Sequence, residues 1–385
     1  MRTLRSRNGC RNRRTMSGQE TYDDGDIALA FEPHENPVPA HERERRLEDP
    51  GFGRVFTDHM AVIDYNEPNG WHGGRITARK PFSMDPASPV LHYAQEIFEG
   101  LKAYHRPNGG AALFRPEANA RRFVNSARRM AMPPLPEEMF LESVRALVRT
   151  DKAWIPDSED GSLYLRPFMF ANGSFLGVRP SPEYTFAVIA SSVGAYFKGD
   201  EPSISLWVTR EYIRAAPGGT GEAKCGGNYA ASLIAQAEAI RHGCDQVVFL
   251  DAVKRRWVEE LGGMNVFFVF DDGSLLTPPL SGTILPGVTR DSLMTIARDL
   301  GVTVREEPYS IEQWEADAQS GRLREAFACG TAAVVTPIGS VESADGKFTI
   351  GGQSSGPLTL RLRSALVDIQ RGTAPDPHGW MEQVA

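Results

Sequence analysis

A single lysine lies inside a glycine-rich segment, Gly218-Gly-Thr-Gly-Glu-Ala-Lys224-Cys-Gly-Gly-Asn-Tyr229, directly before a predicted helix. Glycines let the backbone approach a ligand closely and adopt positive φ angles. The start of a helix offers free N–H groups to an anion. A lysine in this setting can bind a phosphate as a point charge, or it can form a Schiff base with a carbonyl compound.

Three interpretations of Lys224 compete. The first is a nucleotide-phosphate loop with a GxxxxGK frame, but Ala223 replaces its second glycine and Cys225 replaces its magnesium-binding hydroxyl residue. Both changes affect atoms that such a loop uses, so the sequence disfavours an ATP- or GTP-binding module. The second is a solvated surface lysine, the commonest state of this residue type. Five glycines around one lysine disfavour it, since such a loop ordinarily approaches a ligand.

The third interpretation is a lysine that forms a Schiff base with pyridoxal 5′-phosphate, and this cofactor makes further demands. Its pyridine nitrogen needs a carboxylate that keeps it protonated, since that proton makes the ring an electron sink. Its phenolic oxygen needs a hydrogen-bond donor. Its phosphate group needs backbone N–H groups and an arginine.

Each demand has a candidate in the sequence. Leu285-Pro-Gly-Val-Thr289 leads into a predicted helix, where the N–H groups of Val288 and Thr289 can bind a phosphate. Phe327-Ala-Cys-Gly-Thr-Ala332 offers a second turn of small residues with a hydroxyl and free amides. Trp257-Val-Glu-Glu260 offers two carboxylates on opposite faces of a predicted strand, so only one of them can meet the ring.

The elements that position these residues follow from hydrophobic periodicity and turn residues. In the first half we predict helices at Glu117–Met130 and Pro136–Lys152, and strands at Thr57–Tyr65, Leu91–Tyr104, Ala111–Phe114, Leu163–Phe170 and Tyr184–Ser191. In the second half we predict helices at Asn228–His242, Thr289–Leu300 and Pro357–Arg371, and strands at Gln246–Asp251, Arg256–Glu260, Asn265–Phe270 and Ala326–Val335.

This order of elements predicts a mixed α/β (α+β) chain, and its 385 residues suit two domains. Residues 1–50 are predicted to form an irregular N-terminal leader and residues 51–193 a small α/β domain. Residues 194–203 are the predicted interdomain linker. Residues 204–385 are the predicted large domain, which carries Lys224.

The net charge and the cysteine content indicate which binding partners and which cellular compartment suit the protein. The formal net charge is −7, although residues 1–15 carry six arginines and no acid, so the remaining chain carries −13. This acidity argues against a nucleic-acid partner. No apolar run approaches the ~20 residues that span a membrane. The four cysteines form no CxxC pair and no metal spacing, which favours a reduced, cytoplasmic setting without a bound metal.

The arginine-rich start has three interpretations. A disordered leader, or a true start codon at Met16, is favoured. An organelle transit peptide is disfavoured because the segment has few apolar residues for an amphipathic helix.

From about Tyr93 to Gln370, the chain resembles the branched-chain amino acid aminotransferases, which belong to the class IV (fold type IV) pyridoxal-phosphate family. The resemblance rests on Phe98-Glu-Gly-Leu-Lys-Ala, Phe114-Arg-Pro, Leu163-Tyr-Leu-Arg-Pro, Lys224-Cys-Gly-Gly-Asn-Tyr, Glu260-Leu-Gly-Gly-Met-Asn, Thr277-Pro-Pro-Leu, Ile284-Leu-Pro-Gly-Val-Thr-Arg and Gly330-Thr-Ala. It implies a two-domain fold type IV enzyme. Its reaction would be reversible amino transfer from L-leucine, L-isoleucine or L-valine to 2-oxoglutarate, in branched-chain amino acid synthesis or breakdown.

The resemblance also implies the residues that hold the cofactor. Lys224 corresponds to the Schiff-base lysine, which also moves the substrate proton. Glu260 corresponds to the carboxylate on the pyridine nitrogen, and Tyr229 to the phenol on the 3′ oxygen. The phosphate contacts correspond to Arg122, Val288, Thr289 and Thr331, and Arg214 to an arginine near the cofactor.

For the substrate, the resemblance implies that the α-carboxylate binds the amides of Thr331 and Ala332 and the hydroxyl of Tyr164. Arg166 corresponds to the arginine that receives the distal carboxylate of glutamate. The apolar pocket corresponds to Tyr93, Phe98 and Tyr229. Leu176 and Val178 correspond to residues that reach in from a second subunit, so a homodimer is implied.

Some positions depart from the family. Gly263 stands where some members carry a threonine, so a hydroxyl near the substrate is lost. Ala333 and Thr336 occupy the positions of a CxxC switch in animal members, so we expect no such redox control. Cys225 and Cys329 are expected to pack as small apolar residues. Within the fold, D-amino acid aminotransferase and aminodeoxychorismate lyase are the alternatives, and the apolar pocket and the chain length argue against both.

Overall fold

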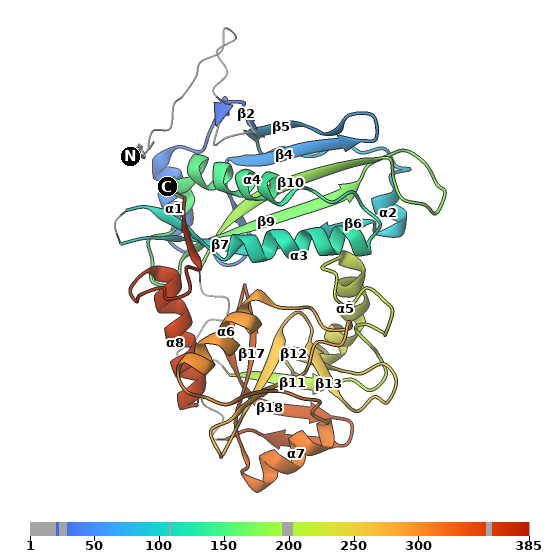
Figure 1. Cartoon of the computed structure of the whole chain (residues 1–385), viewed down its shortest axis with the longest axis vertical. Coiled ribbons are helices and arrows are strands. Elements are labelled where there is room, and N and C mark those ends of the chain that lie inside the picture. The colour runs from blue at the N-terminus through green and yellow to red at the C-terminus, as the bar shows by residue number, and fades with distance from the viewer. Residues whose placement is uncertain (1–20, 23–28, 108, 195–202, 352–355, 385) are drawn as a thin grey trace, which may run out of the picture.

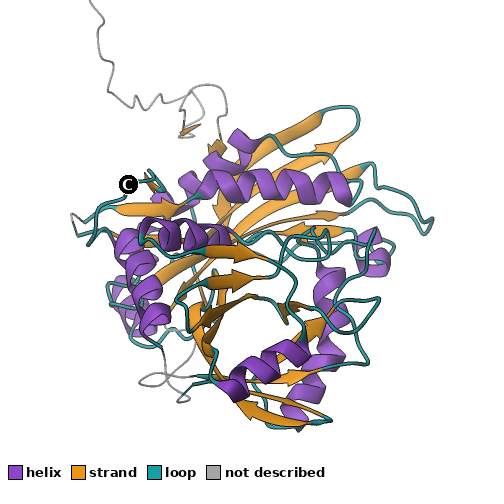
Figure 2. Cartoon of the chain, turned by 60° about the horizontal axis from the view of Figure 1, so that its bottom comes forward, coloured by secondary structure: helices purple, strands orange, loops and turns teal. Residues whose placement is uncertain are grey.

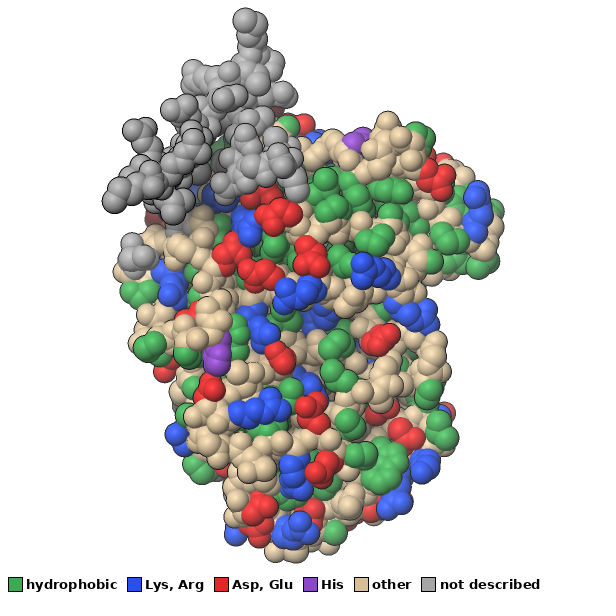
Figure 3. Space-filling model, viewed as in Figure 1, with side chains coloured by type: hydrophobic (Ala, Val, Ile, Leu, Met, Phe, Trp, Pro, Cys, Tyr) green, Lys and Arg blue, Asp and Glu red, His purple; other side chains and the backbone are tan. Residues whose placement is uncertain are grey.

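The computed structural model describes residues 21–22, 29–107, 109–194, 203–351 and 356–384. These residues form two β-sheets with helices packed on them, one sheet above the other in Figure 1. Acidic and basic side chains are interspersed on the face shown in Figure 3. The mixed α and β class predicted from the sequence is confirmed.

The first sheet is built around a long antiparallel pair, β9 (Ser162–Ala171) and β10 (Glu183–Val193), which align from Tyr184 opposite Ala171 to Val193 opposite Ser162. The strand order is β1-β2-β5-β4-β10-β9-β7-β8-β20, with β3 beside β10 and β6 beside β9. The other strands are β1 (Thr21–Tyr22), β2 (Leu29–Phe31), β3 (Val55–Phe56), β4 (His59–Asn66), β5 (Gly70–Ala78), β6 (Glu96–Phe98), β7 (Leu101–His105), β8 (Ala111–Phe114) and β20 (Met381–Gln383).

Two helices cover one face of this sheet, α3 (Pro116–Arg129) and α4 (Glu137–Thr150) (Figure 1). They pack on it through a core in which the ring of Phe123 lies 5.3 Å from that of Phe140 and 5.5 Å from that of Phe186. Proline begins α3 at a position where its missing N–H costs nothing. Three short helical segments complete this half: α1 (Ala40–Leu47), α2 (Pro89–Tyr93) and the 3₁₀ turn η1 (Lys152–Trp154).

The second sheet has the order β13-β12-β11-β18-β17-β14-β15-β16, with β19 beside β18, and its strands curve rather than lie flat (Figure 2). The strands are β11 (Ile204–Val208), β12 (Gln246–Leu250), β13 (Val258–Leu261), β14 (Asn265–Phe270), β15 (Leu275–Thr277), β16 (Val304–Glu306), β17 (Leu323–Gly330), β18 (Val334–Ser343) and β19 (Gly346–Thr349). The helices are α5 (Gly226–Arg241), α6 (Val288–Asp299), α7 (Ile311–Ser320) and α8 (Pro357–Arg371).

Three sequence predictions need correction. Leu91–Tyr104 is not one strand, because Pro89 starts the short helix α2 and Ala94, at φ 48°, ends it. Ala326–Val335 is a hairpin, because the backbone turns at residues 331–333 between β17 and β18. Residues 29–50 are not wholly irregular, since they contain β2 and α1.

The domain boundaries remain a prediction, because residues 195–202 of the predicted linker lie outside the described residues. One difference is clear at the end of the chain. Strand β20 pairs with β8, opposing Met381 to Phe114. The last residues therefore extend the first sheet and do not belong with the second, where the prediction for residues 204–385 placed them.

Candidate active site

Lys224 lies between the two sheets and is held by residues of the first half. Its carbonyl oxygen accepts a hydrogen bond from the backbone N–H of Phe98 on β6, at 2.9 Å. Its own N–H donates to the hydroxyl of Ser126 on α3, at 3.0 Å. The lysine therefore belongs to the second half by sequence but takes its position from the first.

The glycine-rich loop before Lys224 needs its glycines because it is tightly enclosed. A Cβ atom on Gly221 would lie 2.6 Å from the Cα of Thr283, and Gly218 has a φ of 77°. Arg129 of α3 donates to the carbonyl oxygens of Gly218 and Gly219, at 2.8 and 2.9 Å. The loop is thus fixed from both halves of the molecule.

The side chains of Lys224 and Tyr229 meet at the start of α5. The Nζ of Lys224 donates to the Tyr229 hydroxyl at 2.8 Å. Burial, together with the nearby charge of Arg122, lowers the pKa of Lys224 to about 8. Burial and the charge of Glu260 raise the pKa of Tyr229 to about 12, which keeps this phenol protonated.

Glu260 and Glu259 point to opposite sides of β13, as strand alternation predicts. Glu260 is buried and forms an ion pair of 2.7 Å with Arg214. It also accepts hydrogen bonds from the N–H of Leu285 at 2.6 Å and from the amide of Asn265 at 3.1 Å. Burial raises its pKa to about 7, against the pull of Arg214. Glu259 instead accepts a bond from Thr283.

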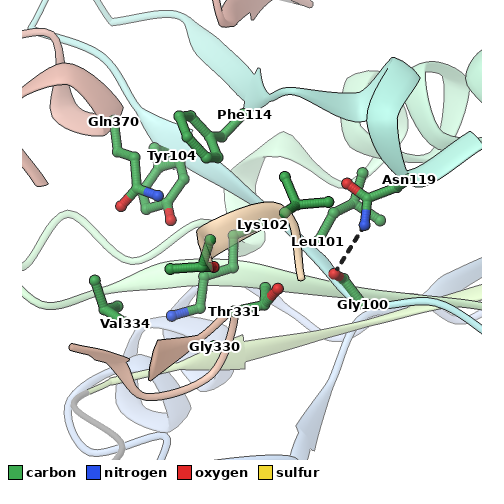
Figure 4. A pocket seen from close by; sticks show the side chains of 12 residues that line it. Gly100, Leu101, Lys102, Tyr104, Phe114, Asn119, Gly330, Thr331, Val334 and Gln370 are labelled. Carbon is green, nitrogen blue, oxygen red and sulfur yellow. Dashed lines mark hydrogen bonds between the residues drawn. The ribbon is translucent and has the colours of Figure 1, made fainter. Parts of the chain in front are cut away.

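The predicted phosphate residues gather at the N-terminus of α6. This helix begins at Val288, and no side chain caps its free N–H groups. Val288, Thr289 and Thr331 line one small cavity of about 20 Å³, shown in Figure 4. Arg122 reaches the same turn, where its Nη1 donates to the carbonyl of Pro286 at 3.0 Å.

The other nitrogens of Arg122 bind the buried carboxylate of Glu99, at 2.7 and 2.8 Å. Asn119 donates to the same carboxylate at 2.7 Å. This pairing fixes the guanidinium at the end of α6. The neighbouring Arg121 is exposed, as helix periodicity predicts.

A larger cavity of about 400 Å³ opens beside Lys224. Its walls include five of the predicted substrate residues, Phe98, Tyr164, Arg166, Thr331 and Ala332, together with Tyr229. The guanidinium of Arg166 donates to the Tyr164 hydroxyl at 3.1 Å and lies 4.8 Å from the centre of the Phe98 ring. Gly100, Gly330 and Thr331 also line the smaller cavity, so the two cavities adjoin.

The turn between β17 and β18 carries the two amides predicted to bind a carboxylate. Lys102, buried on β7, donates from Nζ to the carbonyl of Ala332 at 3.3 Å. Figure 4 shows its side chain running toward Gly330 and Thr331. The turn ends at Val334 with a φ of 59°, a conformation that a β-branched residue rarely adopts. Such strain requires the surrounding contacts to hold it.

Sequence analysis missed Lys102 and Phe52 as members of the site. A signal for Lys102 existed, since a lysine within the apolar strand Leu101–His105 must find a buried partner. Phe52 lines the large cavity, and its ring lies 5.2 Å from that of Tyr164. Phe52 lies between two glycines and before the first predicted strand, Thr57–Tyr65, so periodicity gave no signal for it.

Three predicted substrate residues lie away from the cavity of their own chain. Tyr93, Leu176 and Val178 are 38%, 65% and 86% exposed. The Tyr93 hydroxyl donates to the carbonyl of Leu176. Tyr93 was expected in the same pocket as Phe98, and the structure places it with Leu176 instead.

Positions that depart from the family pattern also have clear places. Gly263 lines the large cavity, where a side chain would meet only the Tyr229 ring, at 3.7 Å. Cys225 and Cys329 are buried in two different hydrophobic clusters and form no disulfide. Burial raises the pKa of the Cys329 thiol far above its ordinary value, so this sulfur stays protonated.

These residues fit the demands of pyridoxal 5′-phosphate. A half-buried lysine with a lowered pKa lies beside a phenol, and a buried carboxylate is held by Arg214 and Asn265. A helix N-terminus without a side-chain cap lies beside Thr331 and Arg122.

In the part of the chain that the structure describes, no cluster of three His, Cys, Asp or Glu side chains could bind a metal. None of the helices described there is long and apolar enough to cross a membrane.

Comparisons with known proteins agree with this geometry. Residues 96–341 match the family model described as amino-transferase class IV. The chain is 55% identical over 358 residues to the probable branched-chain-amino-acid aminotransferase of Streptomyces coelicolor, covering 93% of this chain and 99% of the relative. It aligns with the crystal structure of the branched-chain amino acid aminotransferase of Escherichia coli at a TM-score of 0.71 and 31% identity, covering 85% and 99%. The corresponding enzyme of Thermobaculum terrenum, solved in its PLP-bound holo form, gives a TM-score of 0.68 and 26% identity, covering 85% and 98%.

Proposed function

Because the chain belongs to the class IV aminotransferase family, we propose that it transfers the amino group of L-leucine, L-isoleucine or L-valine to 2-oxoglutarate. The products are the branched 2-oxo acids and L-glutamate. The observation that carries this proposal is the cavity beside Lys224, which combines the apolar wall of Phe98 with the cation of Arg166. Such a cavity can receive both an apolar side chain and a carboxylate.

The family uses pyridoxal 5′-phosphate, and the residues described above would hold it. Lys224 would bind it covalently through Nζ, Glu260 would face its ring nitrogen, and Tyr229 its phenolic oxygen. Its phosphate would lie at the α6 N-terminus, near Thr331 and Arg122. When bound, the cofactor supplies an electron-accepting ring that stabilises negative charge at the substrate Cα, and it carries the amino group between the two half-reactions.

Lys224 is the base of the reaction. Its amine is neutral far more often near neutral pH than an ordinary lysine is, because burial and Arg122 lower its pKa to about 8. The released amine takes the proton from the substrate Cα and holds it on Nζ, within hydrogen-bond distance of the Tyr229 hydroxyl. In the second half-reaction the same nitrogen returns a proton to Cα.

The α-carboxylate, common to all substrates, binds the turn between β17 and β18. The amides of Thr331 and Ala332 and the hydroxyl of Tyr164 are its proposed donors. Arg166 supports this arrangement, because it donates to the Tyr164 hydroxyl and so orients that group's own hydrogen outward. The carboxylate fixes which substrate hydrogen faces Lys224, so it determines stereochemistry as well as affinity.

The side chain of the substrate lies in the larger cavity. Phe98 and Phe52 supply apolar surface for leucine, isoleucine or valine. Arg166 receives the distal carboxylate of 2-oxoglutarate or glutamate. Since the guanidinium already stacks over aromatic rings, it can remain in place while an apolar side chain occupies the cavity.

We also propose that the protein is a homodimer in the cytoplasm. Leu91, Tyr93, Leu176 and Val178 form an exposed apolar group, and solvent exposure of such a group is unfavourable. In a dimer this group would reach the cavity of the partner subunit, which accounts for its distance from the cavity of its own chain. The cysteines described in the structure are unpaired, which suits a reducing compartment.

A single-turnover experiment tests the function. Protein purified with its cofactor is mixed separately with L-leucine, D-alanine and L-aspartate while the visible absorbance of the lysine-bound cofactor is followed. Loss of this band with L-leucine alone, and its recovery with 2-oxoglutarate, is the expected result. A response to D-alanine, or none to L-leucine, would move the protein to another activity of the same family.

A further inference from the structure

Glu96 caps the helix that follows the active-site lysine. It lies on β6, and its Oε1 accepts a hydrogen bond from the backbone N–H of Gly226, the first residue of α5. Cys225, at the N-cap position, supplies no side-chain cap. The carboxylate of Glu96 therefore takes the place of a local capping residue and meets the positive end of the helix.

The contact between Glu96 and α5 is close. A Cβ atom on Gly226 would lie 2.1 Å from Oε1, so a side chain at this position would displace the Glu96 carboxylate. The backbone of Phe98 binds Lys224 two residues further along the same strand. Side chain and backbone of β6 together hold residues 224–226.

Glu96 and Arg166 lie on the same face of the first sheet. Glu96 pairs with Phe170 and Phe98 pairs with Phe168. Arg166 lies two residues beyond Phe168 on β9, so its side chain is on the same face as those of Phe98 and Glu96. The ring of Phe98 lies between them, 4.8 Å from the Arg166 guanidinium. The charge of Arg166 favours the ionised form of Glu96, while burial is the main effect that raises the pKa of this carboxyl.

Arg166 has little other compensation for its charge. Its Nε is buried without a hydrogen-bond partner among the described residues, and its Nη2 donates to the neutral hydroxyl of Tyr164. The nearby amine of Lys224 carries a like charge when protonated and none when neutral, so it offers no compensation. The second carboxylate of this region, Glu99, is already bound by Arg122 and Asn119. Glu96 is thus the nearby carboxylate that no arginine pairs with in the described structure.

We propose that Glu96 is a specificity-determining residue. Its carboxylate offsets the charge of Arg166 while an apolar substrate side chain occupies the cavity. The same carboxylate competes for Arg166 with the distal carboxylate of a dicarboxylic substrate. The proposal rests on the proposed function, in which one cavity accepts both classes. Leucine leaves the half-buried Arg166 without a substrate anion, which Glu96 makes less costly. 2-Oxoglutarate brings its own anion, which Glu96 repels. The carboxylate therefore shifts the balance toward apolar substrates.

The test replaces Glu96 with glutamine, because Glu96→Gln keeps an oxygen acceptor for Gly226 and removes the charge. Two acids of similar length serve as probes, glutarate with a distal carboxylate and 4-methylvalerate with a distal isopropyl group. Their dissociation constants are measured by calorimetry on the holoenzyme, together with KM for 2-oxoglutarate and for L-leucine. Glu183→Gln is the matched control, because it changes an exposed carboxylate of the same sheet that lies six residues along β10 from Ile189, the residue opposite Arg166.

For Glu96→Gln we expect glutarate to bind about three- to tenfold more tightly, the size of effect that one partly screened charge produces. KM for 2-oxoglutarate should fall by a similar factor. Binding of 4-methylvalerate should be unchanged or weaker, and Glu183→Gln should change neither acid. Equal shifts for both acids, or no shift, would overturn the proposal.

A second variant separates charge from helix capping. Glu96→Ala removes both the charge and the acceptor, so it should lower the melting temperature more than Glu96→Gln and change the preference between the acids in the same direction. A change of preference confined to Glu96→Ala would assign the effect to capping and overturn the charge argument. Wild-type protein inactive with leucine and 2-oxoglutarate would instead refute the proposed function, and the two failures are therefore distinguishable.

Discussion

The Nζ atom of Lys224 lies 2.8 Å from the hydroxyl of Tyr229, five residues later in the chain and one turn into α5. One residue precedes the helix and the other is inside it, so the helix start sets their separation. Because the phenol is kept protonated, it can donate a hydrogen bond as well as accept the one from the amine. The backbone of Lys224 is held in turn by Phe98 and Ser126, so contacts from the first half keep the pair in place.

Cofactor capture by the apoprotein should depend on pH through Lys224. Only the neutral amine attacks a carbonyl carbon, and a pKa of about 8 leaves about one molecule in ten neutral at pH 7, against about one in three thousand for an ordinary lysine. The initial rate of capture should rise about tenfold per pH unit below 8 and level off above it. Stopped-flow absorbance between pH 6 and 9.5 measures this. Lys224→Ala should show no covalent capture, and a rate still rising steeply at pH 9.5 would contradict the lowered pKa.

Glu260→Gln should lower kcat by about a hundredfold, because the ring nitrogen would lose the charge that keeps it protonated. The variant should also be less stable, since Arg214 would lose its buried ion-pair partner. Steady-state kinetics and thermal melting measure the two effects. The neighbouring Glu259→Gln is the control, because Glu259 lies on the opposite face and bonds Thr283. Equal losses in both variants would refute the assignment to Glu260.

Arg166→Ala should separate the two half-reactions. Removal of a charge-assisted hydrogen bond to the distal carboxylate should raise KM for 2-oxoglutarate about ten- to a hundredfold. The leucine half-reaction needs no such bond and should change little. Single-turnover rates with L-leucine and with L-glutamate provide the comparison, and comparable damage to both would contradict the role given to Arg166.

Lys102→Met should affect both half-reactions alike. The lysine holds the carbonyl of Ala332, and the same turn receives the α-carboxylate of every substrate. Loss of one hydrogen bond should raise KM for L-leucine and for 2-oxoglutarate by the same factor, about three to ten. Cofactor affinity, measured by fluorescence quenching of the apoprotein, should remain within about twofold. A change in only one KM would show that Lys102 does not act through the turn.

Val178→Asp should convert the dimer to monomers, because the exposed loop tip would carry a charge into the interface. Activity should fall with it, since each cavity would lose the residues supplied by the partner subunit. Light scattering and turnover at several protein concentrations measure both. Val253→Asp, at a valine that is also mostly exposed but lies outside the group formed by Leu91, Tyr93, Leu176 and Val178, is the control. A dimer that persists in Val178→Asp would place the interface elsewhere.

Much of this site was predictable because local patterns determine it. Local backbone geometry determines three of its features: the glycines before Lys224, the alternation of Glu259 and Glu260, and the turn before α6. Helix α8, Pro357–Arg371, was predicted with its observed bounds because a proline begins it and Gly372 ends it.

The features that were missed depend on contacts between distant segments. Phe52 enters the cavity only because residues 51–53 cross beside Tyr164. The apolar run Ala326–Val335 predicted a single strand, although the small residues of Phe327–Ala332 also indicated a turn, and the pairing of β17 with β18 decides for the turn. The return of β20 to the first sheet depends on a pairing with β8, more than 250 residues earlier in the chain, which no local pattern encodes.

The predicted cofactor contacts come from both halves of the molecule: Arg122 lies on α3 in the first half, and Glu260 and Thr289 lie on β13 and α6 in the second. A small molecule held by all three would act as a non-covalent cross-link, so its binding free energy would add to the free energy of unfolding. Removing it would withdraw this stabilisation from both halves at once. The lifetime of the protein in a cell would then follow the supply of the vitamin from which its cofactor is made.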